Sequence, residues 1–198
     1  MLLGLTGGIA TGKSTLTRLL ATAHPFTVFD ADACVHQLLR TDREVIARIQ
    51  QEFSLPRTSE SLPLDRADLR RLIFSSASAR QRLEAIIHPV VRQCWMATRA
   101  ECLNLGRDFL ADIPLLLETG AAPEFDRLLV VAAAPCTQRR RLAAKGLEPA
   151  MVEAMLASQW PLGQKIQTAD HVIWNDGSLA GLGRQASLLL EHLFFPAA

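Results

Sequence analysis

The chain opens with a glycine-rich stretch, "GLTGGIATGKST", between a short apolar run and a run with helical spacing. Gly7, Gly12, Lys13 and Ser14 give this stretch the spacing G-x-x-x-x-G-K-S of a phosphate-binding loop. The glycines, Gly8 among them, let backbone amides approach phosphate closely, and the following helix presents the positive end of its dipole. We therefore predict a nucleoside triphosphate site in which Lys13 reaches the β and γ phosphates and Ser14 offers its hydroxyl to Mg²⁺.

The loop also constrains the fold, because it needs a strand before it and a helix after it. Five apolar runs alternate with helical patterns along the chain, at residues 1–6, 26–30, 107–112, 125–134 and 170–175. Strands that alternate with helices favour a parallel sheet with helices on both faces. We predict an α/β protein with three layers and a five-stranded parallel sheet.

Two helical segments interrupt this alternation, at residues 35–104 and 136–165. Both follow the carboxyl end of a strand, where open α/β sheets bind ligands. We interpret the first as a helical acceptor-binding insertion and the second as a helical lid. The nucleotide-binding core then consists of residues 1–34, 105–135 and 166–198.

Charge and composition narrow the function. Lysine and arginine number 21 against 20 aspartates and glutamates, so no strong field attracts nucleic acid. The four cysteines form no C-x-x-C pair, no apolar run reaches the roughly 20 residues of a membrane span, and the start lacks the basic region of a signal peptide. We expect a cytoplasmic protein that binds neither nucleic acid nor membrane, and nothing implies an obligate protein partner.

The absence of one motif bears on which nucleotide binds. The sequence has no N-K-x-D base-reading motif, which counts against a switch GTPase and favours ATP. The phosphate loop alone does not separate a kinase from an ATPase or from a nucleotide-controlled switch.

Carboxylates follow two of the predicted strands. Asp30 and Asp32 close the second strand, which we expect beside the first, and they share one side if the strand continues through both. Such a carboxylate could take a proton from an attacking hydroxyl, or it could cap a helix. Asp112 closes the third strand, where an aspartate can hold Mg²⁺.

A basic run, "QRRRLAAK", lies in the predicted lid. Arg141 and Lys145 are four residues apart and share a helix face, and Arg139 and Arg140 precede them. A charge run is commonly a solvated face, but phosphoryl transfer needs cations that neutralise the transferred group. We favour the lid function, and which arginine touches phosphate stays open.

Several segments together resemble the dephospho-CoA kinase family over nearly the whole chain. They are "LTGGIATGKST", "DADACVHQLL", "LRRLIF", "LEAIIHPVV", "DIPLLLETG", "QRRRL" and "SQWPLGQKIQTADHVIWNDG". The loop is widespread, whereas the order of D-A-D, H-P and D-I-P-L-L is specific. The resemblance implies transfer of the ATP γ-phosphate to the ribose 3′-hydroxyl of dephospho-CoA, with Mg²⁺ as the cofactor.

The resemblance also implies residue roles. Asp32 resembles the general base, and it acts with Lys13 and Arg141 in catalysis. The ATP contacts fall on Gly8, Ala10, Thr11, Gly12, Lys13, Ser14, Thr15, Arg140 and Asn175. The acceptor contacts fall on Asp32, Arg70, Phe74, His88, Pro89 and Leu115, and the metal contacts on Ser14 and Asp112.

Some positions depart from the family pattern or allow another interpretation. Lys145 stands where the family usually has arginine, which leaves the phosphate contact at this position open because lysine lacks the bidentate fork. His88 before Pro89 could instead mark a helix boundary. The alternatives are a nucleoside monophosphate kinase, which shares the three-part layout, and a nucleotide-dependent switch without transfer chemistry.

Overall fold

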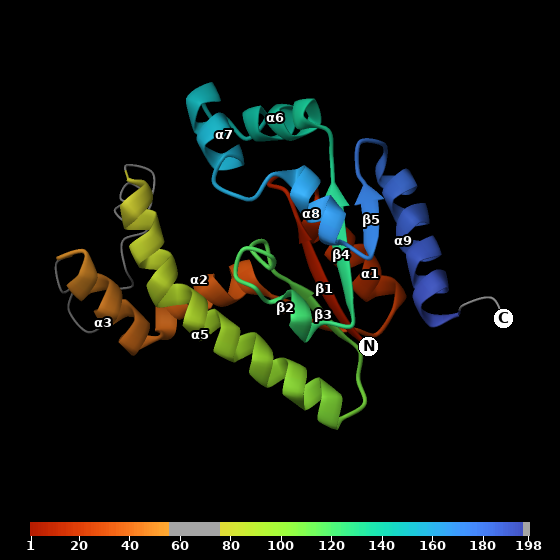
Figure 1. The fold of residues 1–198 in the computed structure, drawn as a ribbon, viewed down its shortest axis with the longest axis horizontal. Helices are drawn as coiled ribbons and strands as arrows, with labels where there is room; N and C mark the ends of the chain where they lie inside the picture. Colours follow the sequence, from red (N-terminus) through yellow and green to blue (C-terminus); the bar gives the residue numbers. More distant parts are fainter. Residues whose placement is uncertain (56–75, 196–198) are drawn as a thin grey trace. The chain divides into compact units, whose positions relative to one another are not determined.

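The structure is a computed structural model that describes residues 1–55 and 76–195 (Figure 1). The described elements, in chain order, are β1 (Leu2–Gly7), α1 (Lys13–Ala23), β2 (Thr27–Asp30), α2 (Ala31–Thr41), α3 (Arg43–Glu52), α5 (Ala77–Asn104), β3 (Phe109–Asp112), the 3₁₀ helix η1 (Ala122–Glu124), β4 (Arg127–Ala132), α6 (Pro135–Ala143), α7 (Pro149–Leu156), α8 (Leu162–Thr168), β5 (His171–Trp174) and α9 (Leu179–Phe194).

The chain forms two compact units. The sheet unit comprises Met1–Phe29 and Arg99–Ala198, and the helical unit comprises Asp30–Thr98. The predicted helical insertion at residues 35–104 overlaps most of the helical unit, which already begins at Asp30. The helices of the predicted lid belong to the sheet unit.

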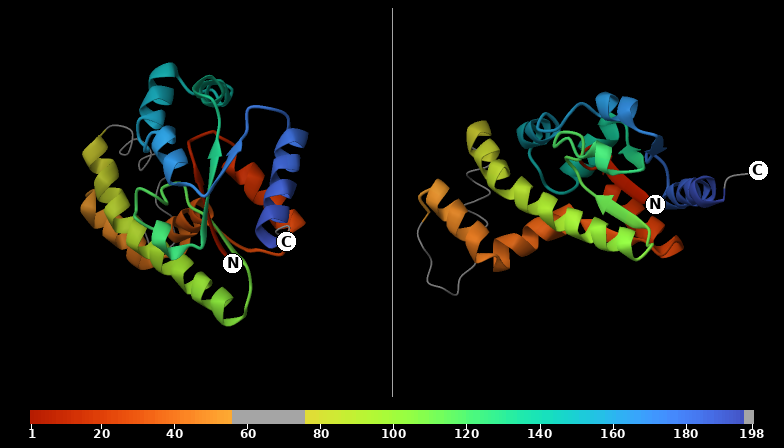
Figure 2. Two further views of the ribbon diagram at one scale, coloured as in Figure 1. Left: turned by 45° about the vertical axis from the view of Figure 1, so that its right-hand side comes forward. Right: turned by 60° about the horizontal axis from the view of Figure 1, so that its bottom comes forward.

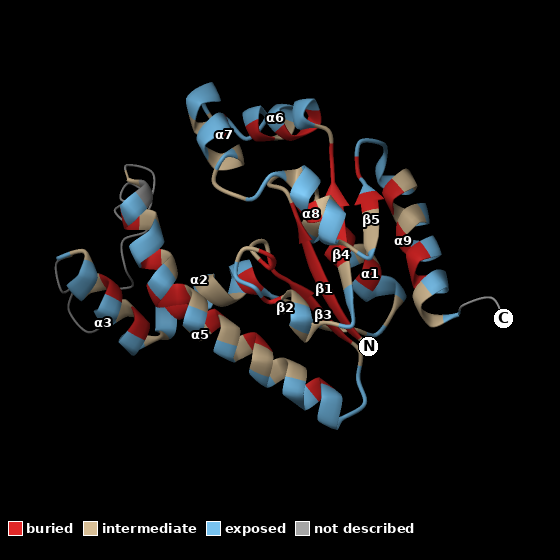
Figure 3. Cartoon of the chain, viewed as in Figure 1, coloured by how far each residue is buried: buried red, intermediate tan, exposed pale blue. Residues whose placement is uncertain are grey.

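The five strands form one sheet in the order β2-β3-β1-β4-β5, and the predicted five-stranded parallel sheet is confirmed. The expectation that β2 lies beside β1 is wrong, because β3 separates them. The physical reason is burial. All four residues of β3 are buried, whereas β2 alternates between partly buried and exposed residues, which suits an edge strand (Figure 3).

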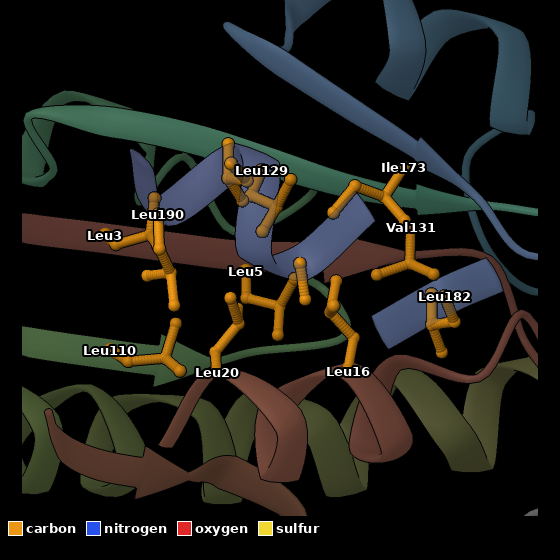
Figure 4. Close-up of a cluster of buried hydrophobic side chains, with 12 residues drawn as sticks. Leu3, Leu5, Leu16, Leu20, Leu110, Leu129, Val131, Ile173, Leu182 and Leu190 are labelled. Atoms are coloured by element: carbon orange, nitrogen blue, oxygen red, sulfur yellow. The ribbon is translucent and has the colours of Figure 1, made fainter. Parts of the chain in front are cut away.

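One face of the sheet packs against α1 and α9, which lie side by side (Figure 2). Alternate residues of the strands point to this face, as expected for a period of two. Figure 4 shows the buried side chains that meet here. They are Leu3, Leu5, Leu16, Leu20, Leu110, Leu129, Val131, Ile173, Leu182, Ala186, Leu189 and Leu190.

The opposite face of the sheet is covered by the segment that follows β3. A Cβ built on Gly4 would lie 2.9 Å from Leu116 and from Phe125, so only glycine fits this position without a shift. The ring of Phe125 also stacks on Phe109 at 6.5 Å. The segment runs along this face, since the N–H of Ile113 donates to the carbonyl of Leu5 at 2.9 Å and the N–H of Asp126 donates to that of Leu2 at 2.8 Å.

In the helical unit, two sequence expectations need correction. The chain turns helical at Ala31, and the side chain of Asp30 caps α2 by accepting a hydrogen bond from the N–H of Ala33 at 2.9 Å. Asp30 and Asp32 therefore do not share one strand face. Pro89 lies inside the 28-residue helix α5, so His88 marks no helix boundary.

Within the described part of the chain, no helix combines the length and the apolar character needed to cross a membrane.

The packing of α9 gives a test of the core. Leu182→Ala should lower the free energy of unfolding by about 2–5 kcal/mol, because Leu182 is buried against the sheet. Leu188 lies on the same helix with 64% of its area exposed, so Leu188→Ala should change stability by about 0.5 kcal/mol or less. Urea unfolding of both variants measures the difference. Equal losses would contradict the assignment of the buried face.

Candidate functional site

The phosphate loop connects β1 to α1 in a shape that few residue types accept. Gly12 has a φ of 95° and directly precedes α1, and Ala10 also has a positive φ of 58°. Thr11 stabilises the turn, since its hydroxyl donates to the carbonyl of Gly8 at 2.8 Å. Positive φ values are costly for residues with a side chain and concentrate at functional sites.

The carbonyl groups of the loop are held by side chains from α6. Gln138 Nε2 donates to the carbonyl of Ile9 at 2.6 Å. Arg141 Nη1 donates to the carbonyls of Ala10 and Thr11, each at 3.1 Å. Gln138 and Arg141 are three residues apart on one helix face, so two side chains of α6 bind the loop.

Asn175, directly after β5, holds the loop from another direction. Its side-chain Nδ2 donates to the backbone carbonyl of Thr11 at 2.8 Å, and its backbone carbonyl accepts from Arg141 Nη2 at 2.7 Å. The amide of Asn175 fills the space where a Cβ on Gly12 would project. Gly12 is therefore required both by its backbone conformation and by this contact.

The N–H groups of the loop point away from the carbonyls that these side chains bind. Among the described residues, none accepts a hydrogen bond from the N–H of Ala10 or Gly12. Since buried or partly buried N–H groups need partners, these donors suit an anion. Together with the start of α1, they form the concave set of amides that binds phosphate in loops of this pattern.

Lys13 forms an ion pair with Asp112, which ends β3. Asp112 is buried, and its second oxygen accepts a hydrogen bond from the hydroxyl of Thr17 at 2.7 Å. Lys13 and Thr17 are four residues apart on α1, so both point toward the same carboxylate. The pair fixes the position of the Lys13 ammonium beside the loop.

The three consecutive arginines of α6 have different surroundings. Arg139 makes two contacts with Glu153 of α7, at 2.6 and 3.0 Å, and the hydrogen bond from Arg139 lowers the pKa of Glu153. Arg140 is exposed. Arg141 alone of the three reaches the phosphate loop. Asp176 holds the residue that precedes α6, because its carboxylate accepts a hydrogen bond from the N–H of Ala134 at 2.9 Å.

The structure brings most of the predicted nucleotide residues together in the sheet unit. The loop residues, Asp112, Arg141 and Asn175 are in contact or adjacent, with Ser14 exposed at the start of α1. Leu115 lies in the segment after β3 and is partly buried.

The remaining predicted acceptor residues belong elsewhere. Asp32 lies in the first turn of α2, and His88 and Pro89 lie in α5, all within the helical unit. His88 is partly buried, whereas Asp32 and Pro89 are exposed. Arg70 and Phe74 fall outside the described residues.

Four residues at the site escaped prediction: Thr17, Gln138, Lys165 and Glu118. The helical spacing could have identified Thr17 and Gln138, since Thr17 lies one turn from Lys13 and Gln138 one turn from Arg141. Lys165 and Glu118 form a buried ion pair at 2.8 Å, which no local pattern indicates.

Metal binding would depend on oxygen atoms at the start of α1 and the end of β3. The hydroxyl of Ser14 and the carboxylate of Asp112 are the kinds of ligand that Mg²⁺ takes. Within residues 1–55 and 76–195, no three His, Cys, Asp or Glu side chains gather into a metal-binding group. This donor set fits an ion held mainly by substrate phosphates and water, and it does not fit a cage built by the protein alone.

Comparisons with known proteins agree with this geometry. The sequence pattern of the family described as dephospho-CoA kinase matches residues 1–181. A dephospho-CoA kinase of Methylococcus capsulatus is 37% identical over 204 residues, covering 100% of this chain and 99% of the relative.

Solved structures show the same fold. A protein called TT1252 from Thermus thermophilus is 32% identical, with a TM-score of 0.77 and coverage of 98% of this chain and 97% of the other. A dephospho-CoA kinase from Campylobacter jejuni has a TM-score of 0.72 at 24% identity, with coverage of 96% of both chains.

The arginines of α6 provide a matched pair of variants. Arg141→Ala removes the charged hydrogen bonds that hold the loop and should lower kcat/KM for ATP by about 10- to 100-fold, a loss of about 1.4–2.8 kcal/mol of transition-state stabilisation. Arg140→Ala removes an exposed neighbour and should change this value by about two-fold or less. Steady-state kinetics with varied ATP separates them. The reverse order would assign the nucleotide contact to Arg140.

Proposed function

The chain belongs to the dephospho-CoA kinase family, and on that premise we propose that it transfers the γ-phosphate of ATP to the ribose 3′-hydroxyl of dephospho-CoA. The family phosphorylates dephospho-CoA in the last step of CoA biosynthesis. The products are CoA and ADP. The observation that carries the proposal is a phosphate loop with outward carbonyls bound by side chains and inward amides left for an anion.

We assign the ATP phosphates to the loop at residues 8–15. Its N–H groups bind phosphate oxygens, and Lys13 places a positive charge against the β and γ phosphates. Arg141 supports this arrangement by holding the loop backbone through Ala10 and Thr11. The bonds that tie down these carbonyls fix the amides in place before ATP arrives, so that little reorganisation is needed during transfer.

The divalent ion expected with ATP is Mg²⁺ in our proposal. Ser14 and Asp112 would hold it, Ser14 through its exposed hydroxyl and Asp112 through its carboxylate. When bound, Mg²⁺ neutralises charge on the phosphates.

Asp32 is proposed as the general base. Its carboxylate takes the proton of the 3′-hydroxyl while the oxygen forms a bond to the γ-phosphorus, and the bond to the β-γ bridging oxygen breaks to release ADP. Support comes from its position, since it is exposed in the first turn of α2 and Asp30 already supplies the helix cap. Arg70, Phe74, His88, Pro89 and Leu115 are the proposed acceptor contacts.

The three-part organisation remains part of the proposal, with residues 35–104 binding the acceptor and residues 136–165 acting as the lid. Within the lid region, Arg139 and Glu153 join α6 to α7. Gln138 and Arg141 join α6 to the phosphate loop. A lid with these contacts can exclude water from the transferred phosphate.

The choice of acceptor is tested directly. The purified protein with Mg²⁺ and ATP should phosphorylate dephospho-CoA, with one ADP formed for each CoA. AMP, CMP and UMP should give no phosphorylated product under the same conditions. Detection of CoA and ADP by chromatography measures both sides of the reaction. Transfer to a nucleoside monophosphate in preference to dephospho-CoA would reject the proposal.

The role of Asp32 as general base is tested by comparing variants of Asp32 and of the neighbouring Asp30. Asp32→Asn should lower kcat by about 10²–10⁴-fold with ATP affinity nearly unchanged, because only proton removal is lost. Asp30→Asn keeps a residue type that caps helices well, so kcat should remain close to that of the wild type. If both variants lose kcat equally, the effect belongs to the start of α2 and the role of Asp32 as base is wrong.

A further inference from the structure

Lys165, on α8, carries a completely buried side chain with a relative exposed area of 0%. Its Nζ lies 2.8 Å from Glu118 Oε1, 2.9 Å from the carbonyl of Pro114 and 3.5 Å from the carbonyl of Gly7. An ammonium group has three N–H donors, and these three oxygens account for them. Lys165 therefore has no donor left for a substrate, in contrast to a lysine that binds phosphate itself.

The two carbonyls that Lys165 binds lie at the ends of neighbouring strands. Gly7 ends β1 and begins the phosphate loop. Pro114 follows two residues after Asp112, the partner of Lys13, and β1 and β3 pair directly with Leu5 opposite Asp112. One ammonium thus ties the start of the phosphate loop to the segment that carries the carboxylate of the site.

Glu118 connects the same cluster to the lid. Its Oε1 accepts from Lys165 and also from the backbone N–H of Trp160 at 3.0 Å, in the connection between α7 and α8. Its Oε2 is buried and has no hydrogen-bond partner among the described residues. Burial lowers the pKa of Lys165, and the carboxylate of Glu118 opposes this shift.

A buried ion pair is a poor means of stabilising a fold. Removing two charges from water costs several kcal/mol per ion, and apolar pairs of similar size are often equally stable or more stable. The unpartnered oxygen of Glu118 adds to this cost. An apolar side chain at position 165 could not donate hydrogen bonds to the carbonyls of Gly7 and Pro114. This is the contribution that requires a lysine.

We propose that Lys165 is a positioning residue for ATP binding, which fixes the phosphate loop relative to Asp112 through the carbonyls of Gly7 and Pro114. Glu118 is its counter-ion and attaches the base of the lid at Trp160. The inference rests on the proposed kinase function, because it concerns the same phosphate site. It assigns a role to a residue that touches neither the nucleotide nor the acceptor.

The test separates positioning from stability with a neutral double variant. Lys165→Met alone leaves Glu118 as a buried, unpaired charge and should lower the melting temperature. Lys165→Met combined with Glu118→Gln removes both charges and should recover most of that loss. Kinetics should not recover: kcat/KM for ATP should stay about 10- to 100-fold below wild type, as is typical when supporting contacts are lost. KM for dephospho-CoA should change by about two-fold or less.

Two single variants complete the design. Glu118→Gln leaves the buried Lys165 without its counter-ion, so the melting temperature should fall. It keeps the donors of Lys165 and an oxygen that can accept from them, so ATP affinity of the folded protein should remain close to wild type. Gln167→Met changes an exposed residue of the same helix and should alter neither stability nor kinetics. Isothermal titration calorimetry of each variant with a non-hydrolysable ATP analogue, without acceptor, measures the affinity of the phosphate site for nucleotide.

Full recovery of ATP affinity in the double variant would overturn the proposal and leave Lys165 a purely structural residue. A loss of affinity in Glu118→Gln as large as in Lys165→Met would overturn it as well, and this comparison holds even if the double variant does not fold. A wild-type protein that binds the ATP analogue but does not phosphorylate dephospho-CoA would reject the kinase function instead. The analogue titrations would still decide the role of Lys165.

Discussion

A backbone that turns its amides toward an anion must turn its carbonyls away, and those carbonyls need donors. In this protein the donors are side chains of Gln138, Arg141 and Asn175, which bind the carbonyls of Ile9, Ala10 and Thr11. The phosphate loop is therefore not a self-contained motif. Its shape depends on α6 and on the end of β5, both more than a hundred residues away along the chain.

This dependence explains why α6 and the phosphate loop belong to one site. Arg141 contacts the loop and the backbone of Asn175, while Asp176, the next residue, accepts a hydrogen bond from Ala134 at the start of the helix that carries Arg141. Each of these contacts restrains the other, since the segment after β5 and the start of α6 hold one another in place. A displacement of α6 would remove the donors from several loop carbonyls together, so the positions of α6 and of the loop depend on each other.

Local patterns predicted much of this arrangement. The loop, the strands and the helices α6 and α7 followed from spacing and periodicity, because those signals arise within short segments. Strand order did not, since it depends on which strand is covered on both faces. The apolar "FLAD" of β3 takes the inner position that was expected for "TVFD" of β2. The cap at Asp30 was a recognised alternative, and the structure selects it.

Two of the four residues that escaped prediction share a physical property. Gln138 and Lys165 are polar residues on helices, and such residues commonly face solvent, yet both are buried here. Their partners are backbone carbonyls or a distant glutamate, which carry no sequence signature, although the helical spacing from Arg141 does point to Gln138 itself. The seven-residue helix α8 extends beyond the helical segment predicted at residues 136–165, and "LGQKIQT" has too few apolar residues to show a helical period. Long-range polar contacts are the part of a site that sequence periodicity does not encode.

The pairing of Lys13 with Asp112 has a consequence for selectivity among anions. An ammonium group has three N–H donors, and the ion pair with Asp112 uses one of them, so an anion can bind Lys13 beside the carboxylate. The carboxylate, itself held by Thr17, already offsets part of the positive charge of Lys13. A single small anion therefore gains less from Lys13 than it would from an unpaired lysine. A ligand with several linked anionic groups meets more of the loop amides at once, so the site favours a polyphosphate chain over a small anion.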